Sequence, residues 1–347
     1  MPHTIVAGIG MYVPERVVAN KELTQYMDTS DEWIQERTGI KERRYAARQG
    51  ETTTTMGIEA AKIALERAGI APKDVDFIIF ATLSPDYYFP GCGVLVQREM
   101  KMGEIGALDI RNQCSGFIYA ISVADQFIKT GMYKNILVIG SEKHSFGLDF
   151  STRGRNITVI FGDGAGAVLL QATEESGRGI LSTHLHSNGE NAESLAMYNP
   201  GTHGNHWGNF AKFDDAELGN TFMSHAMIDE ALIFPNMDGQ AVFKKAVEKF
   251  PEVIKEALDK NNLSTSDIDM LIPHQANFRI SQMIQKLLRL PSEKVFNNIK
   301  KYGNTTAASI PIALCEAWQE GKIKIGDLVC LAAFGSGFTW GSALLRW

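Results

Sequence analysis

An internal repeat constrains the fold of this 347-residue chain more than any other feature of its sequence. The segment KIALERAGIAPKDVDFII at residues 62–79 matches KEALDKNNLSTSDIDMLI at residues 255–272, with an offset of 193 residues. Each copy predicts a helix, a polar Asp-x-Asp turn and a short apolar strand. This alternation is typical of βαβ units around a buried, mostly parallel sheet.

A second pair of segments follows in the same order. The stretch opened by Cys114 leads to GMYKNILVIG, and YGNTTAASIPIALCEAWQ leads to GKIKIGDLVCLAAFG. At an offset of 190, Cys114 corresponds to Asn304. We therefore expect two duplicated α/β halves, at residues 1–182 and 183–347, which meet near these two helix starts.

Residues 189–236 depart from the repeat. This segment is rich in Asn, Gly, His, Met and Phe, and its hydrophobic periodicity is weak. We expect an insertion of loops and a short helix in the second half, which forms a lid or a pocket wall.

The composition predicts a folded, soluble, cytoplasmic protein. Hydrophobic residues make up 44% of the chain, charged residues 21%, and the net charge is −6, which disfavours a general surface for nucleic acid or an anionic membrane. The sequence has no signal-peptide pattern, and no apolar run approaches the ~18 residues of a membrane span. The four cysteines have no CxxC spacing, which favours free thiols in a reducing compartment.

Cys114 is a candidate nucleophile. It lies between a strand end, GALDI, and a run whose apolar residues recur at helical spacing. A helix N-terminus favours a thiolate, so we expect a lowered pKa for this cysteine. The alternative is a small buried residue, which is common for cysteine. Cys92, Cys315 and Cys330 lie in apolar segments and are predicted to be packing residues.

Two further side chains are predicted to lie near this thiol. His274 follows the apolar strand LIP, at the carboxyl end where ligands bind in α/β sheets, and Asn304 lies directly before a helix. The order Cys, His, Asn also occurs in papain-like hydrolases. Those enzymes carry their cysteine in a CGSCW-like segment, whereas Cys114 lies in NQCSGF, and their fold has no place for the repeat.

Glycine-rich segments and histidines offer other sites. FGDGAGAVLL precedes a strand-like run and lacks GxxxxGK, so it predicts a tight turn and no nucleotide-binding loop. The N–H groups of FGSGFTWG could bind an oxyanion. Four further histidines are candidate metal ligands, but no carboxylate motif or HExxH accompanies them, so we predict no metal site. These candidates are His184, His186, His203 and His206.

The three candidate residues lie in motifs that resemble a known family. Together with TSDEWIQERTGIKERR, FGDGAGA, PHQAN, GNTTAASIP and FGSGFTWGSALLRW, they are similar to the β-ketoacyl-acyl-carrier-protein synthase III family of the thiolase superfamily. The resemblance covers nearly the whole chain apart from residues 189–236. It implies a five-layered αβαβα sandwich of two similar halves, usually a homodimer, with a coenzyme A thioester as substrate and no cofactor.

The resemblance also implies a reaction. Cys114 would take an acyl group from acyl-CoA, and the chain would be an acyltransferase that starts fatty-acid synthesis. His274 and Asn304 would donate hydrogen bonds to the thioester carbonyl of malonyl-carrier protein or malonyl-CoA during a decarboxylating condensation. The N–H groups of Cys114 and Ser336 would bind the acyl oxyanion, with Ser336 at a position where typical members have glycine.

The remaining roles implied by the resemblance concern binding. Phe89 would line the acyl pocket of the partner subunit, and Lys244 and Arg279 would dock the acidic carrier protein. The residues implied to bind coenzyme A are Trp33, Arg37, Arg155 and Gln240.

Some positions differ from the usual family pattern. RNQ precedes Cys114 where small residues are usual, Asn156 replaces a glycine, Gln240 replaces an asparagine, and the insertion is long. These differences keep an alternative open, in which the chain is a specialised-metabolite ketosynthase. Such an enzyme joins a CoA-bound or carrier-bound β-keto acid to another acyl unit.

Overall fold

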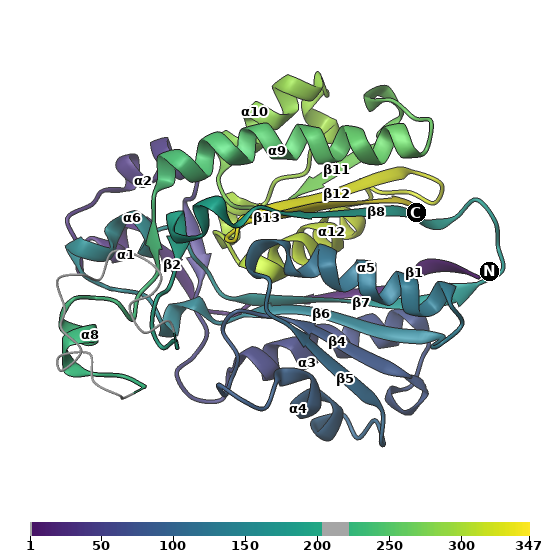
Figure 1. The fold of residues 1–347 in the computed structure, drawn as a ribbon, viewed down its shortest axis with the longest axis horizontal. Coiled ribbons are helices and arrows are strands. Elements are labelled where there is room, and N and C mark those ends of the chain that lie inside the picture. The colour runs from purple at the N-terminus through teal and green to yellow at the C-terminus, as the bar shows by residue number, and fades with distance from the viewer. Residues whose placement is uncertain (1, 203–221) are drawn as a thin grey trace.

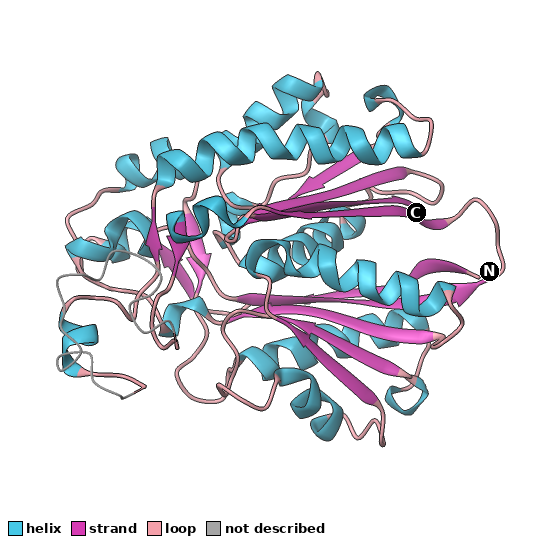
Figure 2. Ribbon diagram, viewed as in Figure 1, coloured by secondary structure: helices cyan, strands magenta, loops and turns pink. Residues whose placement is uncertain are grey.

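The computed structural model describes residues 2–202 and 222–347, and its two main sheets alternate with layers of helices (Figures 1 and 2). The first sheet has the strand order β1-β7-β6-β4-β5, and the second has the order β11-β12-β13-β8. The strands of the first sheet are β1 (His3–Tyr12), β4 (Phe77–Ala81), β5 (Gly106–Ile110), β6 (Asn135–Glu142) and β7 (Gly164–Thr173). Those of the second are β8 (Gly179–Ser187), β11 (Met270–Pro273), β12 (Leu328–Gly335) and β13 (Thr339–Arg346).

Helices form the other three layers. The helices α5 (Gly116–Lys129) and α12 (Ser309–Gln319) form the central layer, between the two sheets. The outer face of the first sheet is covered by α3 (Thr53–Ala68) and α4 (Cys92–Glu99), and that of the second by α9 (Gly239–Lys260) and α10 (Phe278–Leu288). The predicted αβαβα sandwich is therefore observed.

The smaller elements gather mainly at one end of the sandwich, on the left in Figure 1. A hydrophobic cluster there packs β2, which pairs with β3, against α1, α2 and α11. The elements are β2 (Val17–Ala19), β3 (Glu42–Arg44), β9 (Leu195–Ala196), β10 (Asn236–Met237), α1 (Asn20–Leu23), α2 (Asp31–Thr38), α6 (Arg155–Thr158), α8 (His225–Asp229) and α11 (Ile299–Tyr302).

The central helix α5 is the helix predicted from the apolar spacing after Cys114. Its predicted apolar face is buried, including Phe117, Ile121, Ala124 and Ile128, and its side chains contact both sheets. The inner strands β4, β6 and β12 are buried on both faces because each sheet lies between two layers of helices, whereas the edge strand β5 is partly exposed. Cys92, Cys315 and Cys330 lie in these cores as fully buried, free thiols, which confirms their prediction as packing residues.

The duplication extends to the backbone conformation before α5 and α12. Gln113 and Thr306 have left-handed φ angles of 43° and 47°, and their numbers differ by 193. The strands that follow, β6 and β12, are both 8 residues long and begin 193 residues apart. The second pair of segments therefore follows the same offset as the first.

This offset corrects the expected pairing of Cys114 with Asn304. The helix α5 has 14 residues and α12 has 11, so an offset of 190 fits only the turns that follow the two helices. At the helix starts, Cys114 corresponds to Ala307. Gly131 and Gly321, which follow the two helices, are 190 residues apart because α5 is longer than α12. The offset between these glycines therefore does not hold at the helix starts.

Residues 189–202 and 222–236 are the described part of the expected insertion. It contains the short helix α8 and the two-stranded pair of β9 and β10. The predicted histidine candidates His203 and His206 lie outside the described residues. Within the described ranges, no helix is both long enough and apolar enough to span a bilayer.

Candidate active site

Cys114 lies in a 3₁₀ turn, Gln113–Ser115, which joins β5 to α5. Its side chain is buried, and the N–H groups of Cys114 itself and of Ser336, which follows β12, lie beside its sulfur, where they favour the thiolate. A Cβ atom on Gly335 would lie 2.5 Å from the Cβ of Cys114, so only glycine allows β12 to end this close. The two N–H groups predicted to hold an oxyanion thus converge on the thiol.

The electrostatics of this thiol differ from the expectation. Burial, and to a smaller extent the Glu142 carboxylate, raise the pKa of Cys114 to about 12, although the two N–H groups lower it. The expected lowering of its pKa was wrong, because loss of hydration outweighs the favourable field of the helix start. In the free protein the thiol is therefore protonated at neutral pH.

His274 follows β11, at the strand end where the sequence placed it. Its Nδ1 atom lies 2.6 Å from Oγ of Ser309, the first residue of α12. Its Nε2 atom is buried, and none of the described residues forms a hydrogen bond with it. Burial lowers the pKa of His274 to about 3, so the ring is neutral and has one nitrogen available for a ligand.

Asn304 is held at both its backbone and its side chain. Its N–H donates to Ile160 O at 2.9 Å, and its carbonyl accepts from the N–H of Gly162 at 3.1 Å. Its Oδ1 atom accepts from the N–H of Thr306 at 2.8 Å. This bond fixes the orientation of the carboxamide, so Nδ2 is the end that can donate to a ligand.

The turns that carry these three residues meet between the two sheets. The turn with Cys114 packs against the turn Thr306–Ala308, which follows Asn304, and against β12. His274 reaches the same region through Ser309, which begins the helix after that turn.

A cavity of about 690 Å³ contains Cys114 and reaches the surface, because some of its lining side chains are exposed. One part of its wall comes from residues 189–236. The insertion residues in this wall are Leu195, Ala196, Met197 and Pro235. Ser336 supports the wall, since its hydroxyl donates to the carbonyl of Leu195.

Two polar residues of the site, Glu142 and His144, were missed in the sequence. The Glu142 carboxylate is buried and accepts hydrogen bonds from residues of the loop after β4, and burial raises its pKa to about 7. The Nε2 atom of His144 lies 2.5 Å from Oγ1 of Thr306. Both residues lie at or just beyond the carboxyl end of β6, so the strand-end rule that identified His274 would also have identified them.

Three of the residues expected to bind coenzyme A lie together. The guanidinium carbons of Arg37 and Arg155 lie 4.4 and 5.3 Å from the centre of the Trp33 ring. Arg155 also donates to the carbonyl of Asp28 at 2.7 Å. Gln240 is the second residue of α9, where its N–H donates to Asp238, and no hydrogen bond to the Trp33 group is found for it among the described residues.

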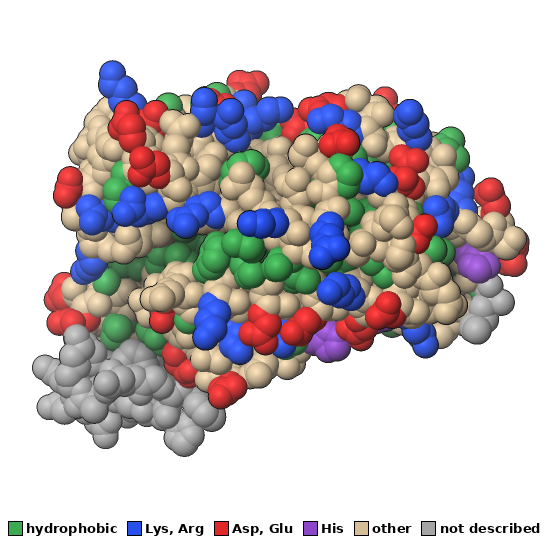
Figure 3. Space-filling model, turned by 90° about the horizontal axis from the view of Figure 1, so that it is seen from above, with side chains coloured by type: hydrophobic (Ala, Val, Ile, Leu, Met, Phe, Trp, Pro, Cys, Tyr) green, Lys and Arg blue, Asp and Glu red, His purple; other side chains and the backbone are tan. Residues whose placement is uncertain are grey.

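The residues expected to contact protein partners lie on the surface. Phe89 is 80% exposed, in the loop between β4 and α4. Lys244 and Arg279 are exposed on α9 and α10, and the Arg279 guanidinium lies 6.0 Å from the Phe243 ring. On the face that these two helices form, Lys and Arg side chains are interspersed with Asp and Glu side chains (Figure 3).

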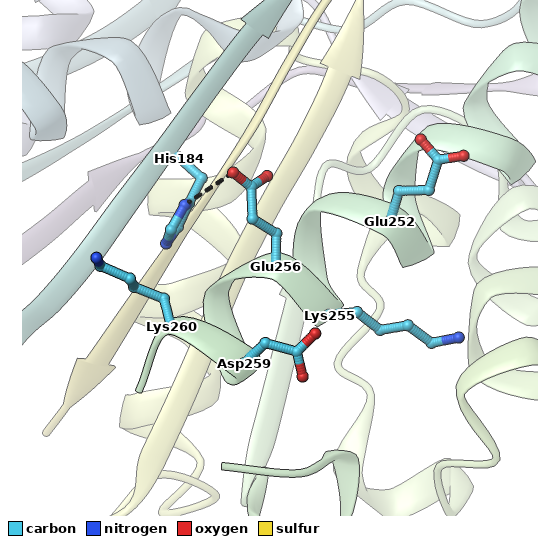
Figure 4. Close-up of a pocket in the computed structure, with 6 residues that line it drawn as sticks. All are labelled: His184, Glu252, Lys255, Glu256, Asp259 and Lys260. Atoms are coloured by element: carbon cyan, nitrogen blue, oxygen red, sulfur yellow. Dashed lines mark ion pairs between the residues drawn. The ribbon is translucent and has the colours of Figure 1, made fainter. Parts of the chain in front are cut away.

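A second cavity, of about 640 Å³, lies beside α9, and its lining is almost entirely charged (Figure 4). The Glu256 carboxylate there lies 3.2 Å from Nδ1 of His184 and 2.6 Å from Nε2 of His186. In the described part of the chain, no group of three or more His, Cys, Asp or Glu side chains could hold a metal ion. A charged lining of this kind is unsuited to an acyl chain.

Comparison with known proteins identifies the family. The model for the C-terminal part of 3-oxoacyl-[acyl-carrier-protein] synthase III matches residues 258–347, and a second model of the same family matches residues 108–189. A curated β-ketoacyl-[acyl-carrier-protein] synthase III from Rhodospirillum centenum is 44% identical over 347 residues, which cover 99% of each chain. The chain belongs to the β-ketoacyl-[acyl-carrier-protein] synthase III family. It is a condensing enzyme of the acyltransferase class, as the sequence resemblance implies.

Solved structures agree with this assignment. The 3-oxoacyl-[acyl-carrier-protein] synthase III from Aquifex aeolicus is 43% identical and superposes with a TM-score of 0.86, with 100% of both chains covered. The priming β-ketosynthase of the R1128 polyketide biosynthetic pathway is 29% identical, with a TM-score of 0.85 and with 99% of this chain and 96% of that chain covered. The predicted thiolase-like fold is confirmed.

Proposed function

We propose that this synthase III family member loads an acyl group from acyl-CoA onto Cys114 and condenses it with malonyl-carrier protein to start fatty-acid synthesis. The observation that carries the proposal is the convergence of the Cys114 and Ser336 N–H groups on a thiol that lines a large cavity. Two peptide N–H groups at a nucleophile form the geometry that stabilises a tetrahedral acyl intermediate.

In the first step, the sulfur of Cys114 attacks the thioester carbonyl of acyl-CoA. The carbonyl oxygen becomes an oxyanion and binds the N–H groups of Cys114 and Ser336. The C–S bond to coenzyme A then breaks, and the coenzyme A sulfur leaves with the proton that the Cys114 thiol loses. The acyl group stays on the enzyme as a new thioester.

In the second step, the malonyl thioester loses carbon dioxide, and the electron pair of the broken C–C bond forms an enolate. Nε2 of His274 and Nδ2 of Asn304 donate hydrogen bonds to the enolate oxygen. Both groups are neutral, and their orientation is fixed by Ser309 and Thr306. The enolate carbon then attacks the acyl carbonyl and releases Cys114. Removal of one such donor typically costs about 3 to 4 kcal/mol of barrier.

Binding of the two substrates is assigned to separate surfaces. Trp33, Arg37, Arg155 and Gln240 hold the nucleotide of coenzyme A, because guanidinium groups suit phosphate and an indole ring suits adenine stacking. Lys244 and Arg279, exposed on neighbouring helices, dock the acidic carrier protein. Besides its thioester substrates, the reaction needs no cofactor.

The working enzyme is proposed to be a cytoplasmic homodimer. The 80% exposure of Phe89 supports this, since a large apolar side chain at the tip of a loop gains free energy by entering a partner's pocket. In that dimer Phe89 lines the acyl pocket of the partner subunit. The free cysteines, Cys92, Cys114, Cys315 and Cys330, suit a reducing compartment.

A second function is favoured by the replacement of small residues before Cys114 with Arg111, Asn112 and Gln113. Arg111 and Gln113 line the cavity, and Asn112 donates to Ser115 at 3.0 Å. In this alternative, the enzyme joins a CoA-bound or carrier-bound β-keto acid to another acyl unit in a specialised pathway.

Intact-protein mass spectrometry tests the proposal. Acyl-CoA should add one acyl mass to the wild type and none to Cys114→Ala, whereas Asn304→Ala should still acylate but fail to condense. Acylation that persists in Cys114→Ala would end the proposal. A panel of acyl-CoAs, each with malonyl-CoA or malonyl-carrier protein, separates the two functions by the mass of the product.

A further inference from the structure

We propose that His144 makes the acyl chamber selective for starter acyl groups that carry an oxygen substituent on their chain. The inference rests on the proposed function, because it names the class of acyl group that Cys114 accepts. His144 is a specificity-determining residue in this proposal and takes no part in bond breaking or bond formation.

The position of His144 places it with the reacting acyl group. Its side chain is only 7% exposed, yet it lines the same cavity as Cys114. Phe161, Thr306 and Leu148 line this cavity as well. An imidazole in this wall is unusual for a site that binds a purely alkyl chain, because a buried polar group is destabilised unless it is hydrogen-bonded.

The imidazole of His144 is held in one orientation. Its Nε2 atom lies 2.5 Å from Oγ1 of Thr306, and its ring centre lies 4.7 Å from that of Phe161. Thr306 is itself fixed, because its N–H donates to Asn304. One ring nitrogen is thus used by the protein and the ring cannot turn freely, so Nδ1 is the polar atom of this ring that is left for a ligand.

The Nδ1 atom of His144 has no hydrogen-bond partner among the described residues. Three hydroxyl groups of the cavity wall are already used: Thr52 donates to Asp86, Thr53 to the carbonyl of Ser84, and Ser84 to Glu142. His144 therefore differs from them in having unused hydrogen-bonding capacity inside the chamber.

The charge state of His144 favours an uncharged oxygen as its partner. Burial and the nearby His274 lower the pKa of His144 to about 3, so the ring is neutral during catalysis. A neutral ring presents either a donor or an acceptor at Nδ1, and a hydroxyl group can satisfy both forms. An alkyl chain would cover Nδ1 and leave it unpaired. A site built to bind a hydroxyl rejects the analogue that lacks it.

The test compares thioesters of equal chain length. Self-acylation kcat/KM would be measured by intact-protein mass spectrometry for butyryl-CoA, 3-hydroxybutyryl-CoA and 4-hydroxybutyryl-CoA. The wild type should prefer at least one hydroxylated thioester over butyryl-CoA by about tenfold or more. His144→Leu should reverse this preference. His184→Leu should keep it, because His184 does not line the cavity that contains Cys114.

The outcomes separate this inference from the proposed function. If Cys114 is acylated and the wild type prefers butyryl-CoA, the inference is overturned and the proposed function stands. An unchanged preference in a folded His144→Leu variant also overturns it. If none of the three thioesters acylates Cys114 but another acyl-CoA does, the inference falls and the proposed function stands; if no acyl-CoA acylates Cys114, both fall. Because the wild-type preference is decisive alone, the test does not depend on the variant folding.

Discussion

Ser309 Oγ lies 2.6 Å from Nδ1 of His274 and also accepts a hydrogen bond from the N–H of Gln275 at 3.3 Å. Because Oγ already accepts one hydrogen bond, its own proton is available to Nδ1. This arrangement favours the tautomer in which Nε2 carries the proton. The hydroxyl group at the start of α12 therefore keeps a proton on Nε2 of His274, which is the donor proposed for the enolate.

Ser309→Ala should slow condensation and spare acylation. Loss of the Nδ1 hydrogen bond, worth about 1 to 1.5 kcal/mol, corresponds to a rate reduction of roughly tenfold. Single-turnover assays would measure loading of Cys114 and formation of the β-ketoacyl product separately. Ser281→Ala is the matched control, because that buried hydroxyl has no partner among the described residues. An equal loss in both steps would contradict the role assigned to Ser309.

Glu142→Gln should make Cys114 more reactive toward iodoacetamide. The Glu142 pKa is about 7, so at pH 8 this carboxylate is charged and raises the pKa of the thiol. Removal of the charge lowers the pKa of the Cys114 thiol, and each unit by which this pKa falls gives about tenfold more thiolate. The effect should fade below pH 6, where Glu142 is already protonated. Glu316→Gln, at another buried carboxylate, should not change the alkylation rate. Slower alkylation of Glu142→Gln at pH 8 would refute this account.

Gly335→Ala should abolish acylation without unfolding the protein. The added Cβ would lie 2.5 Å from Cβ and 2.9 Å from Sγ of Cys114, so the thiol must leave the two N–H groups that bind the oxyanion. We expect a loss of at least 10²-fold in acylation rate, comparable to removal of an oxyanion donor. Gly189→Ala is the control, because a Cβ there meets nothing within 4 Å. Circular dichroism would establish that both variants fold.

The positions of Cys114, His274 and Asn304 could be predicted because each depends on a local pattern. Each lies where a buried apolar strand or a periodic helix stops or starts, and such boundaries can be recognised within about ten residues of sequence. The repeat predicted the alternation of helices and strands for the same reason, whereas the five layers were implied by the family resemblance. The expectation of mostly parallel sheets was wrong, because β1–β7, β6–β7, β12–β13 and β8–β13 pair antiparallel. The packed helices and strands were therefore the most predictable part of the molecule.

The pKa of Cys114 could not be predicted in this way. Its value depends on burial between two halves of the chain and on Glu142, which lies 28 residues further along. The hydrogen bond from His144 to Thr306 likewise joins residues 162 positions apart. Such properties arise from the packing of distant segments, which no local pattern contains.

Phe89→Asp should weaken the proposed homodimer. A charged side chain cannot enter the partner's apolar pocket without an unpaired charge being buried. The dimer of the variant should therefore dissociate at a higher protein concentration than the wild-type dimer does. Analytical ultracentrifugation over a range of protein concentrations would measure this. Ile325→Asp is the matched control, since Ile325 is 81% exposed and lies in the loop between α12 and β12. Equal dissociation of the two variants would argue against a specific role for Phe89.

Arg155→Ala should raise the KM for acyl-CoA but leave the KM for acyl-pantetheine unchanged. The Arg155 guanidinium lies 5.3 Å from the Trp33 ring centre, beside the surface assigned to the nucleotide, which acyl-pantetheine lacks. Loss of a cation–π contact and a phosphate contact, together about 1 to 2 kcal/mol, corresponds to roughly a tenfold change in KM.

Arg98→Ala is the control for this comparison, because Arg98 is exposed on α4 and pairs only with Glu99 among the described residues. It should leave both KM values unchanged. If Arg155→Ala raised the KM for both thioesters equally, Arg155 would act on the pantetheine arm or on folding. The nucleotide would then have to bind elsewhere than at Trp33.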